Sequence, residues 1–265
     1  MTKLSSKGTA YDLHGSLNAP VVVLIHGLGL TRATWDDYLP ILSRHYCVLT
    51  YDLCGHGESA LPERTPSLTV LSEQLRDLLN ELVIARLAVV GFSLGGMINR
   101  RFAMDFPDRV TALGILNSPH ERSPEAQALV EQRAARTEAG GPAATIETTL
   151  ERWFTAEFRA ERPEIIEQVR SLVLDNDPKN YALHRQVLAK GVVELIRPNP
   201  PITLPALVMT CENDSGSTPA MSYAIASEIE AAQTVIVPGL QHMGVVERPD
   251  LFAAALEAFL DDVPV

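Results

Sequence analysis

A serine placed between two glycines, Gly91-Phe92-Ser93-Leu94-Gly95, is the part of this sequence best suited to chemistry. It follows a short apolar run, Leu87–Gly91, and precedes a stretch with helical spacing. At a tight strand-to-helix bend the serine backbone is strained, and side chains two places to either side would collide, which explains the two glycines. The helix N-terminus also offers free N–H groups, notably that of Leu94, to an oxyanion. The pattern predicts nucleophilic attack by Ser93 on a carbonyl carbon.

A serine hydroxyl needs a base to accept its proton, and His242 has the most suitable context. It follows the apolar run Thr234–Val237 and a turn, and it precedes the last predicted helix. His26 and His56 also follow strand-like runs, but each lies in a glycine-rich loop, and we expect His26 to support its loop. The other histidines are expected to be structural or surface residues: His14, His45, His120 and His184.

The base needs an acid that fixes its tautomer and stabilises its charged form. Asp214 follows the apolar run Ala206–Thr210 and is the predicted acid. Glu212 and Asp175 are the alternatives: Glu212 lies nearer the strand end, and Asp175 lies in a segment expected to move. The order Ser93, Asp214, His242 is the nucleophile, acid, base order of one class of hydrolases.

A second oxyanion donor is expected from the loop His26-Gly27-Leu28-Gly29, which follows the run Val21–Ile25. The Leu28 N–H can point inward from this glycine-flanked bend. A simple tight turn is the alternative interpretation. Two backbone donors, of Leu28 and Leu94, would each stabilise the transition state by about 3 kcal/mol.

The elements that must position these residues alternate between short apolar runs and helical patterns, which predicts an α/β fold with a mostly parallel sheet covered on both faces. The predicted strands are Val21–Ile25, Cys47–Tyr51, Leu87–Gly91, Ala112–Leu116, Ala206–Thr210 and Thr234–Val237. The predicted helices are Thr34–Leu42, Ser67–Leu82, Leu94–Phe106, Pro219–Glu230 and Pro249–Leu260.

The alternation stops in residues 119–204, where only helical patterns occur. Four helices are predicted there: Pro124–Glu138, Ala143–Phe154, Pro163–Leu174 and Pro178–Lys190. A block of helices inserted into an α/β sheet is typical of a lid over the carboxyl ends of the strands, where ligands bind. We therefore divide the chain into a core, residues 1–118 and 205–265, and a helical lid, residues 119–204. Padding of the sheet is the alternative.

Composition narrows the classes of partner. The 265 residues carry 22 basic and 33 acidic side chains, a net charge of −11, which argues against nucleic acid and anionic membranes as partners. Three cysteines without a Cys-x-x-Cys pair predict neither a disulfide framework nor a thiolate zinc site. No histidine pair has helical metal-ligand spacing, and Met1–Gly15 contains no apolar stretch typical of a secretory signal. We expect a cytoplasmic protein with no metal and no cofactor.

With these motifs the chain resembles the α/β-hydrolase superfamily. The resemblance covers nearly all of the sequence outside the lid and rests on five motifs: His26-Gly27-Leu28-Gly29 with Trp35 downstream, Asp52-Leu53-Cys54-Gly55-His56-Gly57-Glu58-Ser59, Gly91-Phe92-Ser93-Leu94-Gly95-Gly96, Asp214, and Gly239-Leu240-Gln241-His242-Met243. Two positions depart from the family pattern. Cys54 replaces an arginine, so an ion pair that often braces that loop is expected to be absent, and Cys211 replaces a glycine. Serine at 93 excludes the haloalkane dehalogenase and epoxide hydrolase branches, which carry aspartate there.

The chain length, the lid and the segment Leu150-Glu151-Arg152-Trp153-Phe154-Thr155 look like 3-oxoadipate enol-lactonases and small esterases. Phe92, Trp153 and Phe154 are candidate substrate-binding residues, although Trp153 and Phe154 are equally suited to anchoring the lid in its own core. Five lid arginines are candidates for holding a substrate carboxylate, but exposed helix arginines are the commoner case: Arg133, Arg136, Arg152, Arg159 and Arg185.

The resulting hypothesis is a serine hydrolase for a small-molecule carboxylic ester or lactone. It acts through an acyl-enzyme on Ser93, with His242 as base, Asp214 as its orienting acid, and Leu28 and Leu94 as oxyanion donors. Hydrolysis of a carbon–carbon bond in a ring-cleavage diketone, cofactor-free perhydrolysis and a non-catalytic ligand receptor are the alternatives. The identity of the acyl and alcohol groups and the oligomeric state stay open.

Overall fold

A computed structural model describes residues 2–263 and contains one eight-stranded sheet in the order β1-β2-β4-β3-β5-β6-β7-β8. The strands are β1 (Lys3–Leu4), β2 (Ala10–His14), β3 (Val21–Ile25), β4 (Cys47–Tyr51), β5 (Leu87–Phe92), β6 (Val110–Leu116), β7 (Ala206–Cys211) and β8 (Ala232–Val237). Strands β3 to β8 run parallel to one another, whereas the pairs β1–β2 and β2–β4 are antiparallel. The predicted α/β class with a mostly parallel sheet is confirmed.

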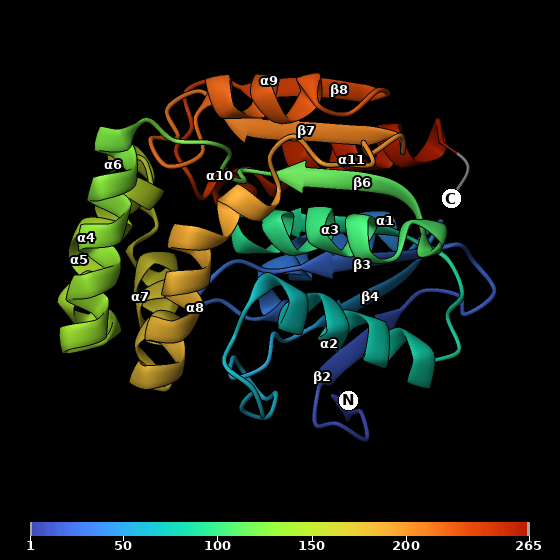
Figure 1. The fold of residues 1–265 in the computed structure, drawn as a ribbon, viewed down its shortest axis with the longest axis horizontal. Coiled ribbons are helices and arrows are strands. Elements are labelled where there is room, and N and C mark those ends of the chain that lie inside the picture. Colours follow the sequence, from blue (N-terminus) through green and yellow to red (C-terminus); the bar gives the residue numbers. More distant parts are fainter. Residues whose placement is uncertain (1, 264–265) are drawn as a thin grey trace.

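Helices cover both faces of this sheet (Figure 1). Helices α2 (Leu68–Glu81), α3 (Leu94–Asp105) and α9 (Pro219–Ser227) pack on one face, and α1 (Leu39–Leu42) and α11 (Pro249–Asp261) on the other. Because both faces are covered, every residue of β4, β5, β6 and β7 is buried. Helix α2 shows how sequence sets this packing: its leucine stripe faces the core, and Ser67 caps it by accepting the Val70 N–H.

The segment between β6 and β7 consists of helices that lie at the carboxyl ends of the strands, to which the arrows of β6 and β7 point in Figure 1. They are α4 (Pro124–Gly140), α5 (Ile146–Trp153), α6 (Ala156–Glu161), α7 (Pro163–Leu174) and α8 (Pro178–Lys190). The prediction of four helices here was wrong. The expected helix Ala143–Phe154 splits at Thr145, whose backbone is not helical, and α6 was not expected.

Two sets of polar contacts fasten these helices to the core. Asn176 and Asn180 donate from their side-chain amides to the carbonyls of Gly29 (3.1 Å) and Gly55 (2.9 Å), in the loops after β3 and β4. On the other side, the carbonyl of Trp153 accepts the N–H of Met243 at 2.8 Å. The helices are therefore tied directly to the loops that carry the predicted chemistry.

Short 3-10 helices and one further α-helix complete the structure: η1 (Arg32–Tyr38), η2 (Pro107–Arg109), η3 (Pro142–Ala144), η4 (Gly191–Glu194) and α10 (Gly244–Glu247). Within residues 2–263, no helix is both long and apolar enough to cross a membrane.

Candidate active site

Ser93 lies at a sharp bend between β5 and α3, with φ 55° and ψ −112°, a conformation that a non-glycine residue rarely adopts. The bend leaves no room for side chains at the flanking glycines. A Cβ atom on Gly91 would lie 2.1 Å from the carbonyl oxygen of Gly95, and one on Gly95 would lie 2.3 Å from that of Ile25. The glycines thus permit a turn that projects the serine hydroxyl from the sheet edge.

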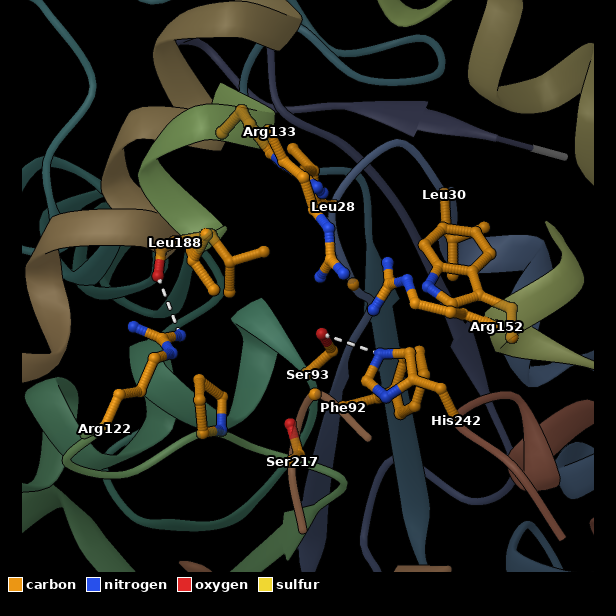
Figure 2. Close-up of a pocket in the computed structure, with 16 residues that line it drawn as sticks. Leu28, Leu30, Phe92, Ser93, Arg122, Arg133, Arg152, Leu188, Ser217 and His242 are labelled. Carbon is orange, nitrogen blue, oxygen red and sulfur yellow. Dashed lines mark hydrogen bonds between the residues drawn. The ribbon is translucent and has the colours of Figure 1, made fainter. Parts of the chain in front are cut away.

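The structure brings Ser93, His242 and Asp214 together from three distant parts of the chain. His242 Nε2 lies 3.1 Å from Ser93 Oγ, and His242 Nδ1 lies 2.6 Å from Asp214 Oδ2. Figure 2 shows the imidazole of His242 directed at the Ser93 hydroxyl. All three residues are buried, with Asp214 only 2 % exposed. Both imidazole nitrogens are therefore engaged, one by an acid and the other by the candidate nucleophile.

Hydrogen bonds hold Asp214 in its ionised form. Its Oδ1 accepts the N–H groups of Gly216 (2.8 Å) and Ser217 (2.9 Å), and its Oδ2 accepts Asn117 Nδ2 (3.0 Å). Burial by itself raises the pKa of this carboxyl, but His242 and these donors outweigh burial and lower the pKa below its ordinary value. Sequence reasoning did not identify Asn117, which follows β6 with φ 45°. Its place at the same sheet edge is the one signal that could have found it.

The two alternative acids lie elsewhere. Glu212 accepts the Gly239 N–H at 2.9 Å and so braces the turn that precedes His242. Asp175 is exposed at the C-terminus of α7.

The two N–H groups predicted to bind an oxyanion, those of Leu28 and Leu94, belong to segments that flank Ser93. Leu94 opens α3, so its N–H has no partner within the helix. Gly27 packs against Ser93, because a Cβ on Gly27 would lie 3.4 Å from the Ser93 Cβ, and this contact sets Leu28 at the same pocket. Neither N–H is taken by another acceptor among residues 2–263.

His26 supports the loop that carries Leu28. Its Nδ1 donates to the Gly27 carbonyl at 2.8 Å and its Nε2 accepts the Leu53 N–H at 2.9 Å. His26 is fully buried, and burial lowers its pKa, which keeps it in the neutral form that these two bonds require.

Comparison with known proteins defines the family. The model of the Alpha/beta hydrolase family matches residues 22–255 of this chain. The chain belongs to the alpha/beta hydrolase family. The match includes all three residues of the Ser93, Asp214 and His242 cluster.

The similarity of this hydrolase to its relatives covers nearly the whole length of the chain. It is similar to the (E)-2-((N-methylformamido)methylene)succinate hydrolase of Acinetobacter baylyi, with 27 % identity over 99 % of this chain and 98 % of the relative. It is also similar to 3-oxoadipate enol-lactonase 2 of the same organism, with 28 % identity over 94 % of this chain and 92 % of the relative. The crystal structure of the enol-lactonase from Burkholderia xenovorans LB400 superposes with a TM-score of 0.88 and 30 % identity, covering 96 % of each chain. The predicted resemblance to the superfamily and its enol-lactonase members is confirmed.

A pocket beside Ser93 and His242 lies between the core and the helices α4, α5 and α8. Phe92 and Trp153 line it, and their rings lie 5.1 Å and 6.0 Å from the imidazole of His242. Phe154 does not line it: its ring is fully buried and stacks on Phe158 at 5.5 Å. The prediction that Phe154 binds substrate was therefore wrong. Trp153 and Phe154 are neighbours at the end of α5, but their side chains point in different directions.

Arginines also line the pocket. Of the five lid candidates, Arg133, Arg152 and Arg185 do so, whereas Arg136 is exposed and Arg159 lies outside it. A further arginine, Arg122, lines the pocket from the segment between β6 and α4. It precedes the predicted helices, and nothing in the sequence around it distinguishes it from a surface residue.

A buried arginine, Arg100, supports the loop that carries Ser93. Arg100 on α3 donates to Gly96 O (2.9 Å), to Ser118 Oγ (3.1 Å) and to Pro119 O (2.7 Å). The Ser118 hydroxyl in turn donates to the Ser93 carbonyl at 3.0 Å. Arg100 thereby ties the turn after β6 to the bend that holds Ser93.

Position 54 is Cys and supplies no ion pair, but another arginine takes over the bracing of this loop. Arg32, the first residue of η1, forms ion pairs with Asp52, Asp12 and Glu58. The Asp52 side chain is fully buried and also accepts the Arg32 N–H at 2.7 Å. The guanidinium that braces this loop thus comes from position 32 instead of position 54.

Proposed function

We propose that this hydrolase cleaves a carboxylic ester or lactone through an acyl-enzyme on Ser93. The observation that carries the proposal is the continuous chain from Ser93 Oγ through the His242 imidazole to Asp214, with distances of 3.1 Å and 2.6 Å. Similarity to proteins named enol-lactonases supports the same class of bond. In this proposal, residues 119–204 form the lid and Phe92 and Trp153 contact the substrate.

In the first half-reaction, Ser93 Oγ attacks the substrate carbonyl carbon while His242 Nε2 accepts the serine proton. The carbonyl oxygen becomes an oxyanion, which accepts hydrogen bonds from the N–H groups of Leu28 and Leu94. Asp214 holds the ring with its proton on Nδ1 and stabilises the imidazolium that forms. The tetrahedral intermediate then collapses, the carbon–oxygen bond breaks, and His242 returns its proton to the leaving alkoxide.

In the second half-reaction, a water molecule replaces the alcohol. His242 Nε2 accepts a proton from water, and the hydroxide attacks the acyl carbon in the same oxyanion site. When the intermediate collapses, the Ser93 oxygen leaves and regains its proton from His242. The carboxylic acid product then leaves the pocket as a carboxylate, and the resting enzyme is restored.

The test combines activity with direct detection of the intermediate. Purified protein and its Ser93→Ala variant are assayed with 4-nitrophenyl esters and with an enol-lactone, and acid-quenched reactions are examined by intact mass. We expect an acyl adduct that maps to Ser93 in the native protein, and a loss of at least about 10⁴-fold in turnover in the variant. Ester or lactone turnover by a folded Ser93→Ala protein would refute the proposal.

A further inference from the structure

The pocket beside Ser93 has a concentration of positive charge. Four of its lining residues are arginines, and none of the described lining residues is Asp or Glu. They come from different elements: Arg122 from the segment after β6, Arg133 from α4, Arg152 from α5 and Arg185 from α8. Figure 2 shows Arg133 and Arg152 reaching from the helices into the space around Ser93.

These guanidinium groups have few partners in the protein. Arg122 donates to the carbonyls of Leu188 (3.3 Å) and Ala189 (3.2 Å) and to Gln127 Oε1 (3.2 Å), but its Nε is buried without a partner. Within residues 2–263, Arg133, Arg152 and Arg185 form no ion pair and donate no hydrogen bond, and the Nε of Arg185 is buried without an acceptor. The pocket therefore holds many free donors.

Arginines elsewhere in the hydrolase are commonly paired with carboxylates, as Arg101 is with Asp105 and Arg170 with Glu167. Carboxylates are plentiful in a chain with 33 acidic and 22 basic residues. Unpaired arginines gathered in one pocket are thus not the result of a shortage of partners. Partly buried like charges cost free energy unless something of opposite charge compensates them.

The cost is visible in the protonation equilibria. Burial, followed by repulsion from Arg185, lowers the pKa of Arg122 to about 10. Burial, followed by repulsion from Arg133 and Arg185, likewise lowers the pKa of Arg152 to about 10, although Asp214 and Tyr181 act in the opposite direction. Both groups stay protonated at neutral pH, so the pocket is cationic although the chain as a whole is anionic.

We propose that the substrate cleaved at Ser93 carries at least two carboxylate groups, bound by Arg122, Arg133, Arg152 and Arg185. The inference rests on the proposed ester or lactone hydrolysis and names the substrate class of that site. A carboxylate accepts two parallel hydrogen bonds from one guanidinium, so these side chains recognise it by shape as well as by charge. A single carboxylate would leave most of the positive charge and most of the donors of the pocket uncompensated.

The experiment uses three 4-nitrophenyl esters with the same leaving group and different acyl charge: butyrate, glutarate with one free carboxylate, and tricarballylate with two. We expect kcat/KM to rise with each carboxylate. In Arg133→Gln and Arg152→Gln, kcat/KM for the dianionic ester is expected to fall about 10- to 100-fold more than kcat/KM for the butyrate ester, the value of a hydrogen-bonded charge. The matched control is Arg136→Gln, an exposed residue one turn further along α4, which should leave all three values unchanged.

Either of two kinetic results would overturn the inference. One is an equal kcat/KM for the butyrate and tricarballylate esters in the native protein. The other is an equal loss of kcat/KM for these two esters in the arginine variants. Calorimetry with free tricarballylate and with inorganic phosphate tests binding without turnover. We expect tricarballylate to bind, and to bind at least about tenfold more weakly to Arg133→Gln. Absence of binding, or tighter binding of phosphate, would contradict a carboxylate site. Activity retained in Ser93→Ala would instead refute the acyl-enzyme alone and leave the charge preference measurable.

Discussion

Replacing Asp214 with asparagine preserves the shape of the side chain and removes its charge. The carboxylate accepts four hydrogen bonds, with Oδ1 facing the N–H groups of Gly216 and Ser217 and Oδ2 facing His242 and Asn117. A carboxamide has a single oxygen. With that oxygen kept toward the two backbone N–H groups, the new –NH₂ faces His242 Nδ1.

The substitution therefore reverses the tautomer of the imidazole. An amide N–H donating to His242 Nδ1 places the ring proton on Nε2, which then donates to Ser93 Oγ at 3.1 Å instead of accepting its proton. The charge that stabilises the imidazolium is lost as well. A wrong tautomer in a Ser-His-Asp triad lowers kcat by about 10⁴-fold, equivalent to about 5 kcal/mol, and we expect a loss of about 10³- to 10⁴-fold here.

The assay is kcat on the best 4-nitrophenyl ester for native protein and Asp214→Asn, with circular dichroism and urea unfolding to verify the fold. Glu212→Gln is the matched control, because this neighbouring carboxylate is exposed and binds only the Gly239 N–H. Its kcat should stay within about threefold, since a surface hydrogen bond of this kind contributes little. A loss below tenfold in a folded Asp214→Asn protein would show that Asp214 does not set the protonation of His242.

Two further predictions concern stability. Arg32→Met leaves the fully buried carboxylate of Asp52 without its cation and should lower the free energy of unfolding by about 3–5 kcal/mol in urea titrations. The control, Arg64→Met, breaks an exposed ion pair and should lower it by at most about 1 kcal/mol. Equal effects of the two variants would show that the buried ion pair contributes no more to stability than the exposed one. Burial lowers the pKa of His184 to about 4, so the unfolded chain binds a proton at higher pH than the folded one, and stability should fall by up to about 3 kcal/mol as the pH drops from about 6.5 through 4. His184→Gln should flatten that pH dependence of the urea midpoint, and an unchanged slope would assign it to other groups.

Local backbone requirements made the core of the fold and the nucleophile bend predictable. The predicted strands match β3 to β8 to within two residues at each end. Strands β3 to β7 lie inside the sheet, and strands covered on both faces need continuous apolar runs. The glycines at 91 and 95 are required by contacts of 2.1 and 2.3 Å that no side chain could relieve. Such signals lie within a few residues of each other, and they survive in a single sequence.

Strands β1 and β2, at one edge of the sheet, gave no such signal. Strand β2 (Ala10–His14) pairs with β4 near the sheet edge, and only its first two residues are buried. Its sequence mixes polar and apolar residues, and β1 is only two residues long, so neither forms an apolar run. Their antiparallel pairing depends on tertiary contacts, which the periodicity of apolar residues does not reveal.

The arginines of the pocket show the same limit more sharply. Arg133 and Arg136 lie three residues apart on α4, a spacing that places side chains on neighbouring positions of a helix surface. Only Arg133 lines the pocket, since the packing of α4 against α8 determines which part of that surface faces the core. Helical periodicity finds the buried stripe of a lid helix, but it does not tell a residue at the rim of that stripe from one turned to solvent.

The position of Arg32 explains why this chain tolerates Cys54 where the family pattern has arginine. A buried carboxylate such as Asp52 needs a cation, but the requirement is on the location of the charge and not on the residue that supplies it. Arg32 reaches Asp52 from the start of η1, directly after the loop that follows β3 and carries Leu28. The ion pair therefore joins the end of the Leu28 loop to the loop after β4. A change that weakens it should disturb the oxyanion site as well as stability, an effect that an arginine confined to the second loop would not produce.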